Sequence, residues 1–281
     1  MAYPPSPVLI PSALTSVDAV LAWIPNAQLQ SGPELKRQIT GLINSASRAI
    51  LSITSRGSVN VRQVTETRTG YNQPSLFLSN WPVLEFTSMT IDGQAVTSVP
   101  TGVTGGYNVD PWDGDVPGRP QMIHLLGSTF PSTPNSIVMS YVAGYGVFGE
   151  SHTVGSTGEV WPEGPLGRYS ANWKVLSAAG AVLSPTTSLT PSAGQYKPPD
   201  NDAEPYRFNN AQGVVSLYYS FCPAEMDYAC AKWVGEWLSY RLRIGQRTIS
   251  AGGQVTTSYE ISEMPADVKR LCNQFSRVAP Y

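Results

Sequence analysis

The strongest pattern in this 281-residue chain is a helix that begins at Pro223 and ends before Gly245. Proline suits the first turn of a helix, and glycine suits the position just after the last turn. At about 100° per residue, one broad apolar side gathers Met226, Cys230, Trp233, Trp237, Tyr240 and Ile244. A second apolar strip gathers Ala231, Leu238 and Leu242. We expect the first side to face the chain's own core and the second to face a neighbouring subunit, with Glu236 and Arg243 in ion pairs between subunits.

Three further helices are predicted, at about 16–23, 33–55 and 265–277. Each combines a capping residue or a proline at its start with apolar residues at spacings of three and four. Residues 246–262 are polar and β-branched around a Gly-Gly pair, which is typical of a hairpin or a flexible arm.

From residue 58 the apolar pattern changes from helical to alternating. Strands are predicted at 59–64, 75–78, 85–91, 94–99, 107–112, 122–126 and 136–143. We therefore interpret 58–146 as an antiparallel β region. Residues 147–213 are rich in Gly, Pro, Ser and Thr and separate two similar strand patterns, so we interpret them as an inserted β subdomain.

These patterns predict an α+β fold whose core is a small helical bundle, with a projecting antiparallel β region and an inserted β subdomain. The expected division assigns 1–57 to an N-terminal arm and core helices, and 58–146 to the β region. It assigns 147–213 to the insert, and 214–281 to core helices and a C-terminal docking tail.

The overall charge argues against a protein that holds nucleic acid through its phosphates. The formal net charge is −2 and the pI is near 5.7, whereas phosphate binding needs a basic surface. No run approaches the ~20 apolar residues that span a bilayer, and the N-terminus lacks the pattern of a signal peptide. We expect a protein that is cytosolic when made, has no membrane partner, and keeps Cys222, Cys230 and Cys272 as buried thiols.

The chemistry-bearing residues do not assemble a catalytic set. Residues 144–149 fit G-x-G-x-x-G, but residues 150–155 do not resemble the helix that a phosphate site needs. The only histidines, His124 and His152, are too few for a histidine-based metal site. Three aspartates could bind calcium or act as a carboxylate pair, although their spacing also suits a turn: Asp110, Asp113 and Asp115. We predict a protein that is not an enzyme and has no cofactor, and the calcium alternative stays open.

Three aromatic residues of the insert could stack on sugar rings: Trp161, Tyr169 and Trp173. Aromatic residues in a Gly- and Pro-rich β segment more often form a small core or an interface. The alternative function, from another class, is therefore a carbohydrate- or receptor-binding virion protein built on the β segments.

Several strings occur along the chain in a particular order. They are Trp81-Pro82-Val83, Ile91-Asp92-Gly93, Tyr141-Val142-Ala143-Gly144-Tyr145, Pro223-Ala224-Glu225-Met226, Tyr240-Arg241-Leu242-Arg243-Ile244-Gly245 and Phe275-Ser276-Arg277-Val278-Ala279-Pro280. Their order resembles the head-to-tail connector, or adaptor, proteins of tailed double-stranded DNA bacteriophages. Each string is a packing or turn pattern, and the resemblance does not extend over 147–213.

The resemblance implies a structural virion protein that forms a ring, usually of twelve subunits, below the portal at the capsid vertex. Tail, stopper or collar proteins would assemble on the ring, and double-stranded DNA would cross it only as passing cargo. The protein would lie in the neck of the virion and, during assembly, in the host cytoplasm. The chain end supplies the expected portal-docking residues, which are Phe275, Arg277, Val278, Pro280 and Tyr281.

Overall fold

We analysed a computed structural model of the chain. It describes residues 8–24, 32–100, 105–110, 121–163, 167–199, 204–241, 248–251, 255–258 and 264–276. The described residues form sixteen strands and four helices.

The helices occur where the sequence predicts them. They are α1 (Val17–Trp23), α2 (Pro33–Ile53), α3 (Ala224–Arg241) and α4 (Ala266–Gln274). The Ser16 side chain accepts a hydrogen bond from the Ala19 amide and caps α1, while Pro33 occupies the first turn of α2. Helix α3 is central, because α1, α2 and α4 all pack against it.

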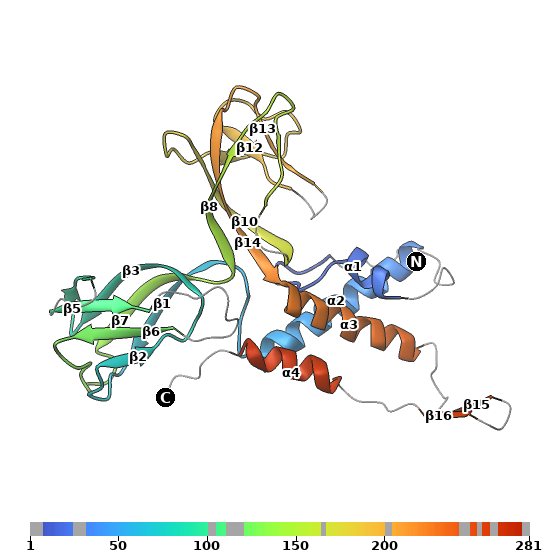
Figure 1. Ribbon diagram of the computed structural model, residues 1–281, viewed down its shortest axis with the longest axis horizontal. Helices are drawn as coiled ribbons and strands as arrows, with labels where there is room; N and C mark the ends of the chain where they lie inside the picture. The colour runs from blue at the N-terminus through green and yellow to red at the C-terminus, as the bar shows by residue number, and fades with distance from the viewer. Residues whose placement is uncertain are drawn as a thin grey trace, which may run out of the picture.

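Two antiparallel sheets form the lobe on the left of Figure 1. The first has the order β1 (Arg62–Arg68), β7 (Ile137–Ala143), β3 (Val83–Ile91) and β4 (Gln94–Val96). The second has the order β2 (Ser75–Phe77), β6 (Met122–Leu126) and β5 (Gly106–Val109). Apolar residues of both sheets share one core, in which Phe130, Met139 and Ile123 are fully buried. Most of the β region predicted over 58–146 therefore forms a lobe with a core of its own, which runs from Val64 to Ala143.

Three strands rise from the helices into the upper lobe of Figure 1 and form its neck. They pair antiparallel in the order β10 (Gly167–Ser177), β14 (Val214–Pro223) and β8 (Gly146–Thr153). The remaining strands of the lobe form a small sheet of β11 (Ser184–Pro185), β12 (Gln195–Lys197), β13 (Tyr206–Phe208) and β9 (Glu159–Val160). The insert is thus joined to the rest of the chain by hydrogen-bonded strands.

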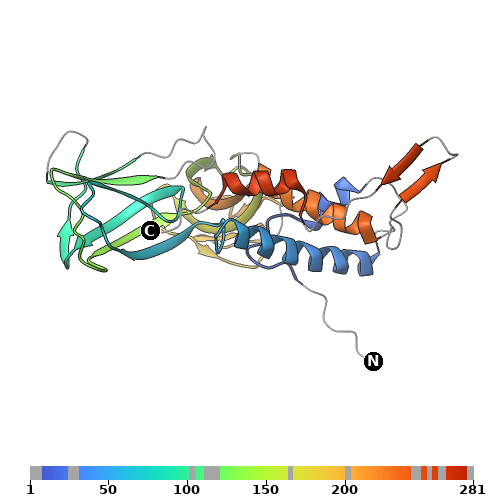
Figure 2. The ribbon, with the colours of Figure 1, turned by 90° about the horizontal axis from the view of Figure 1, so that it is seen from below.

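A separate hairpin lies between α3 and α4 in the sequence. Strands β15 (Thr248–Ala251) and β16 (Val255–Ser258) pair antiparallel with each other. Figures 1 and 2 show the hairpin beyond the ends of α3 and α4, and it makes no substantial contact with another described helix or strand. The polar hairpin predicted within 246–262 is present.

The predicted fold class is wrong, because strand structure dominates and the helical bundle is not the core of the molecule. The described apolar residues form three cores: one helical, one in the left lobe and one in the upper lobe. Even the helical core includes residues from outside the helices, among them Val59, Trp81, Tyr145 and Phe221. Long helices give a strong periodic signal, whereas most of the described strands have five residues or fewer, so the sequence pattern overstated the helices.

The two-residue turn between β7 and β8 allows little space for a side chain. Gly144 has φ +136°, and a Cβ there would meet the Asn60 carbonyl oxygen at 2.5 Å. We expect Gly144→Ala to lower the free energy of unfolding by about 3 kcal/mol, because it combines backbone strain with a clash against backbone. Gly149→Ala is the matched control: Gly149 has φ +79°, but its nearest neighbour would be the Tyr218 hydroxyl at 3.5 Å, so the loss should be about 1 kcal/mol. Equal losses in urea denaturation would contradict the role given to the clash.

Candidate functional site: the junction and the exposed faces

Arg56 follows the end of α2 and joins three parts of the fold. Its side chain is buried, and its Nε donates to the Phe275 carbonyl oxygen at 2.5 Å. Its Nη1 donates to the Trp81 carbonyl oxygen at 2.7 Å, and the guanidinium lies over the Trp81 ring at 4.1 Å from the centroid. A buried cation is stable only where acceptors and an aromatic face replace its water. Arg56 therefore holds the ends of α2 and α4 against the start of β3.

Tyr145, in the turn between β7 and β8, completes this junction. Its amide donates to the Val59 carbonyl, and its own carbonyl accepts from the Phe221 amide of β14. Its ring meets the rings of Trp81, Phe221 and Phe275 edge to face, with centroids 6.0 to 6.3 Å apart. Burial raises the pKa of the Tyr145 hydroxyl far above its usual value, although the nearby Arg56 cation opposes this. The left lobe, the neck and the helices thus meet at one aromatic cluster.

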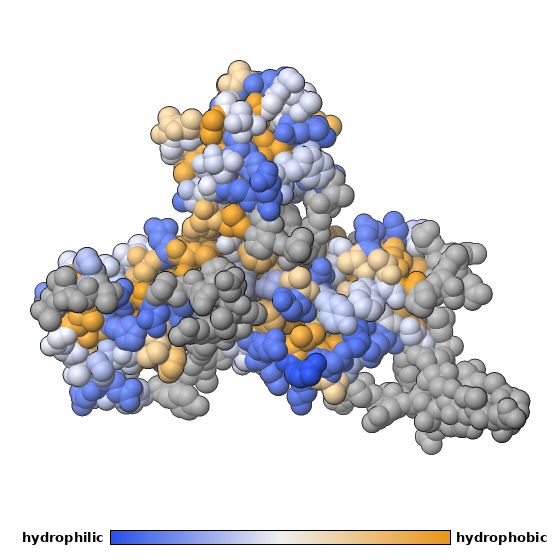
Figure 3. Space-filling view, in the orientation of Figure 1, coloured by the Kyte–Doolittle hydropathy of each residue, from blue (hydrophilic) through white to orange (hydrophobic). Residues whose placement is uncertain are grey.

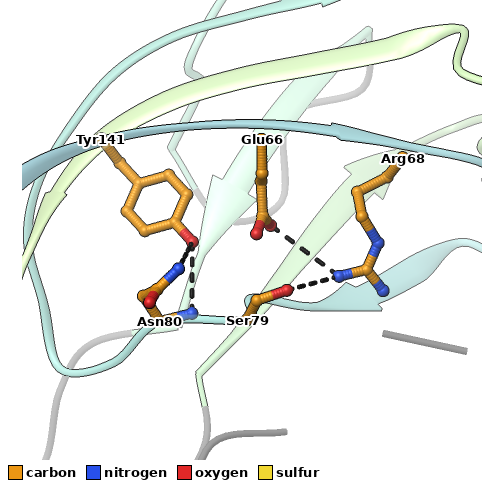
Figure 4. A network of polar contacts seen from close by, with 5 residues as sticks. All are labelled: Glu66, Arg68, Ser79, Asn80 and Tyr141. Carbon is orange, nitrogen blue, oxygen red and sulfur yellow. Dashed lines mark hydrogen bonds and ion pairs between the residues drawn. The ribbon is translucent and has the colours of Figure 1, made fainter. Parts of the chain in front are cut away.

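A polar network closes the edge of the left lobe at β1 (Figure 4). Arg68 donates to the Ser79 hydroxyl at 2.8 Å and lies 3.9 Å from the Glu66 carboxylate. The Tyr141 hydroxyl accepts from the Asn80 amide at 3.3 Å. The side chains of Glu66 and Arg68 are only 10% and 12% exposed, so charges point inward on an edge strand. This arrangement protects an open sheet edge from pairing with other chains.

The same network predicts a dependence of stability on alkaline pH. Burial, followed by the Glu66 charge, raises the pKa of Tyr141 to about 12. Its ordinary pKa is near 10, so the folded protein holds this proton more tightly than the unfolded chain does. This contribution to stability is fully present below pH 10 and is lost as the pH rises through 12, by about 3 kcal/mol in all.

Tyr141→Phe should remove that part of the pH dependence. We expect the difference in unfolding free energy between the wild-type protein and the variant to be constant from pH 7 to 9 and to shrink above pH 10. Urea denaturation at a series of pH values measures it. A difference that stays constant up to pH 11.5 would contradict the assignment to Tyr141.

A second polar cluster lies on the neck. The Glu150 carboxylate accepts from the Tyr219 hydroxyl at 2.6 Å and from the Glu163 amide at 2.7 Å, and it contacts His152 at 2.5 Å. Burial alone would raise the pKa of Glu150, but these hydrogen bonds hold it below its usual value. Two neck strands and the loop after β9 are tied together here, which stiffens the connection to the upper lobe.

The predicted subunit strip lies largely inside the chain. Ala231 and Leu238 are 2% and 4% exposed and belong to the helical core, so they are not available to a neighbouring subunit. Both apolar sides of α3 are covered from within, because α1, α2 and α4 pack against it. Glu236 is exposed, and its predicted ion pair with a neighbouring subunit stays a prediction. Leu242 and Arg243 lie outside the described residues.

The structure describes only one of the five residues predicted to dock on the portal. Phe275 is 1% exposed, and its ring and carbonyl belong to the junction, so it is a core residue and not a docking residue. Arg277, Val278, Pro280 and Tyr281 lie outside the described residues. Sequence analysis missed the role of Arg56. An arginine just after a helix is usually exposed to solvent, and no sequence pattern here distinguishes the buried Arg56 from an exposed arginine.

The remaining candidate sites have structural explanations where the structure describes them. Residues 144–145 form the turn before β8 and residues 146–149 belong to β8, so this string leads into a strand and not into a helix. Asp110 lies 3.0 Å from His124, which also contacts the Ser75 hydroxyl at 2.7 Å, while Asp113 and Asp115 lie outside the described residues. Within the described ranges, no group of three or more His, Cys, Asp or Glu residues could hold a metal ion.

The cysteines agree with the prediction of buried thiols. Cys222, Cys230 and Cys272 are free and buried. Burial raises the pKa of the Cys272 thiol to about 11. A thiol with such a pKa stays protonated and unreactive at neutral pH.

Several large apolar side chains lie on the surface, which Figure 3 shows as a mixture of apolar and polar areas on all three lobes. Trp161 of the upper lobe is 52% exposed. The structure does not describe the side chains of Tyr169 and Trp173. On the helical layer, Trp23 is 45% exposed and Tyr228 is 38% exposed, and their rings meet edge to face at 5.0 Å. None of the helices in the described part of the chain is long and apolar enough to cross a membrane.

Comparisons with known proteins assign no family to this arrangement. No protein-family model matches the chain. No curated protein matches it either.

Proposed function

We propose that this protein is a structural subunit of the head–tail connector of a tailed bacteriophage. In this proposal, copies of the chain form a ring, of twelve subunits by analogy with the family, that joins the portal to the tail. Tail, stopper or collar proteins would bind the ring, and double-stranded DNA would pass through it without being held. The ordered strings of residues, from Trp81-Pro82-Val83 to the chain end, support the choice of this family.

The observation that carries an assembly role is the β15–β16 hairpin. Two paired strands are marginally stable on their own in water and need a third strand or a packing surface. The hairpin finds neither in the described part of its own chain, and it reaches beyond the helices (Figures 1 and 2). A segment of this kind is best explained by a binding surface on another molecule.

The three-lobed shape supports the same role. Each lobe has its own core, and all three meet at the junction of Arg56 and Tyr145. The chain therefore presents separate rigid surfaces in different directions (Figure 1). That arrangement suits a subunit that must contact its neighbours, a partner above it and a partner below it, all at once.

The decisive experiment is electron microscopy of the purified full chain, alone and mixed with the portal protein encoded in the same genome. We expect closed rings of the chain on one end of the portal. A chain that remains monomeric with the portal present, and that does not co-sediment with it, would overturn the proposal.

A matched variant tests the hairpin. Deleting 248–258 and bridging the gap with glycine and serine removes no described residue of the three cores. Circular dichroism should therefore change little, whereas ring formation on the portal should fall by about tenfold or more. A deletion variant that forms rings as well as the wild-type chain would show that the hairpin is not the assembly element.

A further inference from the structure

We propose that α2 of one copy docks on α3 of the next copy, with two arginines facing two glutamates. This inference rests on the proposed ring and names the two faces that would meet in it. The arginines are Arg37 and Arg48 on α2, and the glutamates are Glu225 and Glu236 on α3. The occupant of each face is thus a second copy of this chain.

The acidic face lies along α3, between α1 and α4. Glu225, Tyr228 and Glu236 are exposed, and they lie on one side of the helix at spacings of three and eight residues. On one flank, Trp23 of α1 packs against Tyr228. Lys232 lies on this same side of α3, between Tyr228 and Glu236; it is paired with Asp267 of α4 and also interacts with the Glu236 charge. The face therefore carries one exposed aromatic ring and a net charge of −2, because the pair of Lys232 with Asp267 adds no net charge to the two glutamates.

The basic face is the solvent side of α2. Arg48 is exposed and forms no ion pair with another described residue. Arg37 is one quarter exposed and lies 4.0 Å from Glu34, the one acidic group on this side of the helix. An exposed ion pair of this kind stabilises the fold by less than about 1 kcal/mol, so Arg37 can readily exchange Glu34 for a better partner. Between the two arginines, Gly41 and Ser45 leave a shallow surface, since a Cβ at Gly41 would meet nothing within 4 Å.

The two faces match in spacing. Arg37 and Arg48 are eleven residues apart, and so are Glu225 and Glu236. Eleven residues are about three helical turns, or about 16.5 Å, so both pairs return to nearly the same side of their helices. Two helices packed side by side can therefore place both arginines against both glutamates at once. In antiparallel packing, with Arg48 opposite Glu225, the exposed Ser45 lies across from Tyr228 and leaves room for its ring.

The two faces also point in opposite directions. Ile39, Ile43 and Ile50 are fully buried on the side of α2 opposite the arginines, and Ser47 contacts Cys230 on the buried side of α3. Figure 2 shows α2 along one side of the helical layer and α4 along the other. A patch that meets a different patch on the next copy generates a ring or a filament and not a closed two-fold dimer. This is the geometry that the proposed function needs.

Charge-reversal variants of the full chain test the pairing. The first carries Arg37→Glu with Arg48→Glu, and the second carries Glu225→Arg with Glu236→Arg. Each should self-associate at least about tenfold more weakly than the wild-type chain, because like charges then face each other across every contact. The control carries Lys36→Glu with Lys269→Glu, two exposed lysines outside both faces, and should associate as the wild-type chain does.

Mixing the two variants in equal amounts provides the sharpest result. Every contact between unlike copies then has opposite charges, so the mixture should assemble with the two variants alternating. Sedimentation velocity, with and without the portal protein, measures association, and circular dichroism checks that each variant is folded. Added salt should weaken association of both the wild-type chain and the mixture.

Three outcomes would overturn the inference. Two variants that assemble alone like the wild-type chain would show that these faces are not in contact, while the proposed ring would stand. Variants that fail alone and also fail when mixed would show that the faces bind something other than each other. A wild-type chain that forms no oligomer, alone or on the portal, would remove the proposed function and this inference together.

Discussion

Replacing Arg56 with alanine should lower the free energy of unfolding by about 4 kcal/mol. The substitution leaves the buried carbonyls of Trp81 and Phe275 without a donor, and each such loss costs about 1 to 3 kcal/mol. It also removes a buried cation from the face of the Trp81 ring, which is worth about 2 kcal/mol. Urea denaturation followed by circular dichroism at the helical band, and by tryptophan fluorescence, measures the loss.

Two variants bracket this expectation. Arg48→Ala removes an exposed arginine from the same region of the chain and should change the stability by less than about 0.5 kcal/mol. Arg56→Lys keeps the charge, but a single ammonium group cannot reproduce the planar fork that reaches two carbonyls and covers a ring, so its loss should be intermediate. If Arg56→Ala costs no more than Arg48→Ala, the junction does not depend on the guanidinium.

Replacing Leu238 with glutamate should prevent the helical core from folding or cost about 5 kcal/mol. Leu238 is 4% exposed, so the substitution removes a buried apolar side chain and places a carboxylate in its position. From the sequence alone, the same substitution is expected to disturb only a contact between subunits. The two interpretations differ in the stability of the isolated chain, which thermal unfolding at low protein concentration measures.

Controls separate these interpretations. Leu238→Met nearly conserves the side-chain volume and should cost less than about 1.5 kcal/mol. Ser45→Glu introduces the same charge at an exposed position of α2 and should leave the stability of the isolated chain almost unchanged. If Leu238→Glu unfolds like the wild-type chain but fails to form rings, then Leu238 faces a subunit after all and its burial in the isolated chain is relieved on assembly.

The helices and the left lobe were the most predictable parts of the fold. Periodic apolar residues and terminal prolines located all four helices, and alternation located strands such as β3 and β7. The number of cores was not predictable, because it depends on which short strands pair, and β14 reaches its partners β8 and β10 across long stretches of chain. Two apolar sides of α3 were read from periodicity correctly, but periodicity does not say whether the second side meets α1, α4 or another molecule.

The candidate site was less predictable than the fold. The importance of Arg56 and Tyr145 arises from groups that are distant in the sequence, since Arg56 donates to the carbonyl of Phe275, 219 residues further along the chain. Exposure of Glu236 could be inferred from the polar sector of the helix. The glutamates of α3 and the arginines of α2 have equal spacings, but this match is informative only when both faces are known to be exposed and to point in opposite directions.

The neck of the upper lobe has a mechanical consequence. Strands β8, β10 and β14 run from the helical layer into the lobe, and β14 is hydrogen-bonded to a neighbour on each side, with register shifts in both pairings. A pull along these strands loads many hydrogen bonds in shear at the same time, whereas a flexible tether would yield one bond at a time. The lobe therefore behaves as a stiff lever: a force applied at its tip is delivered to Tyr145, Phe221 and the end of α2 with little loss. A molecule that docks on the lobe can in this way tilt the helices from a distance.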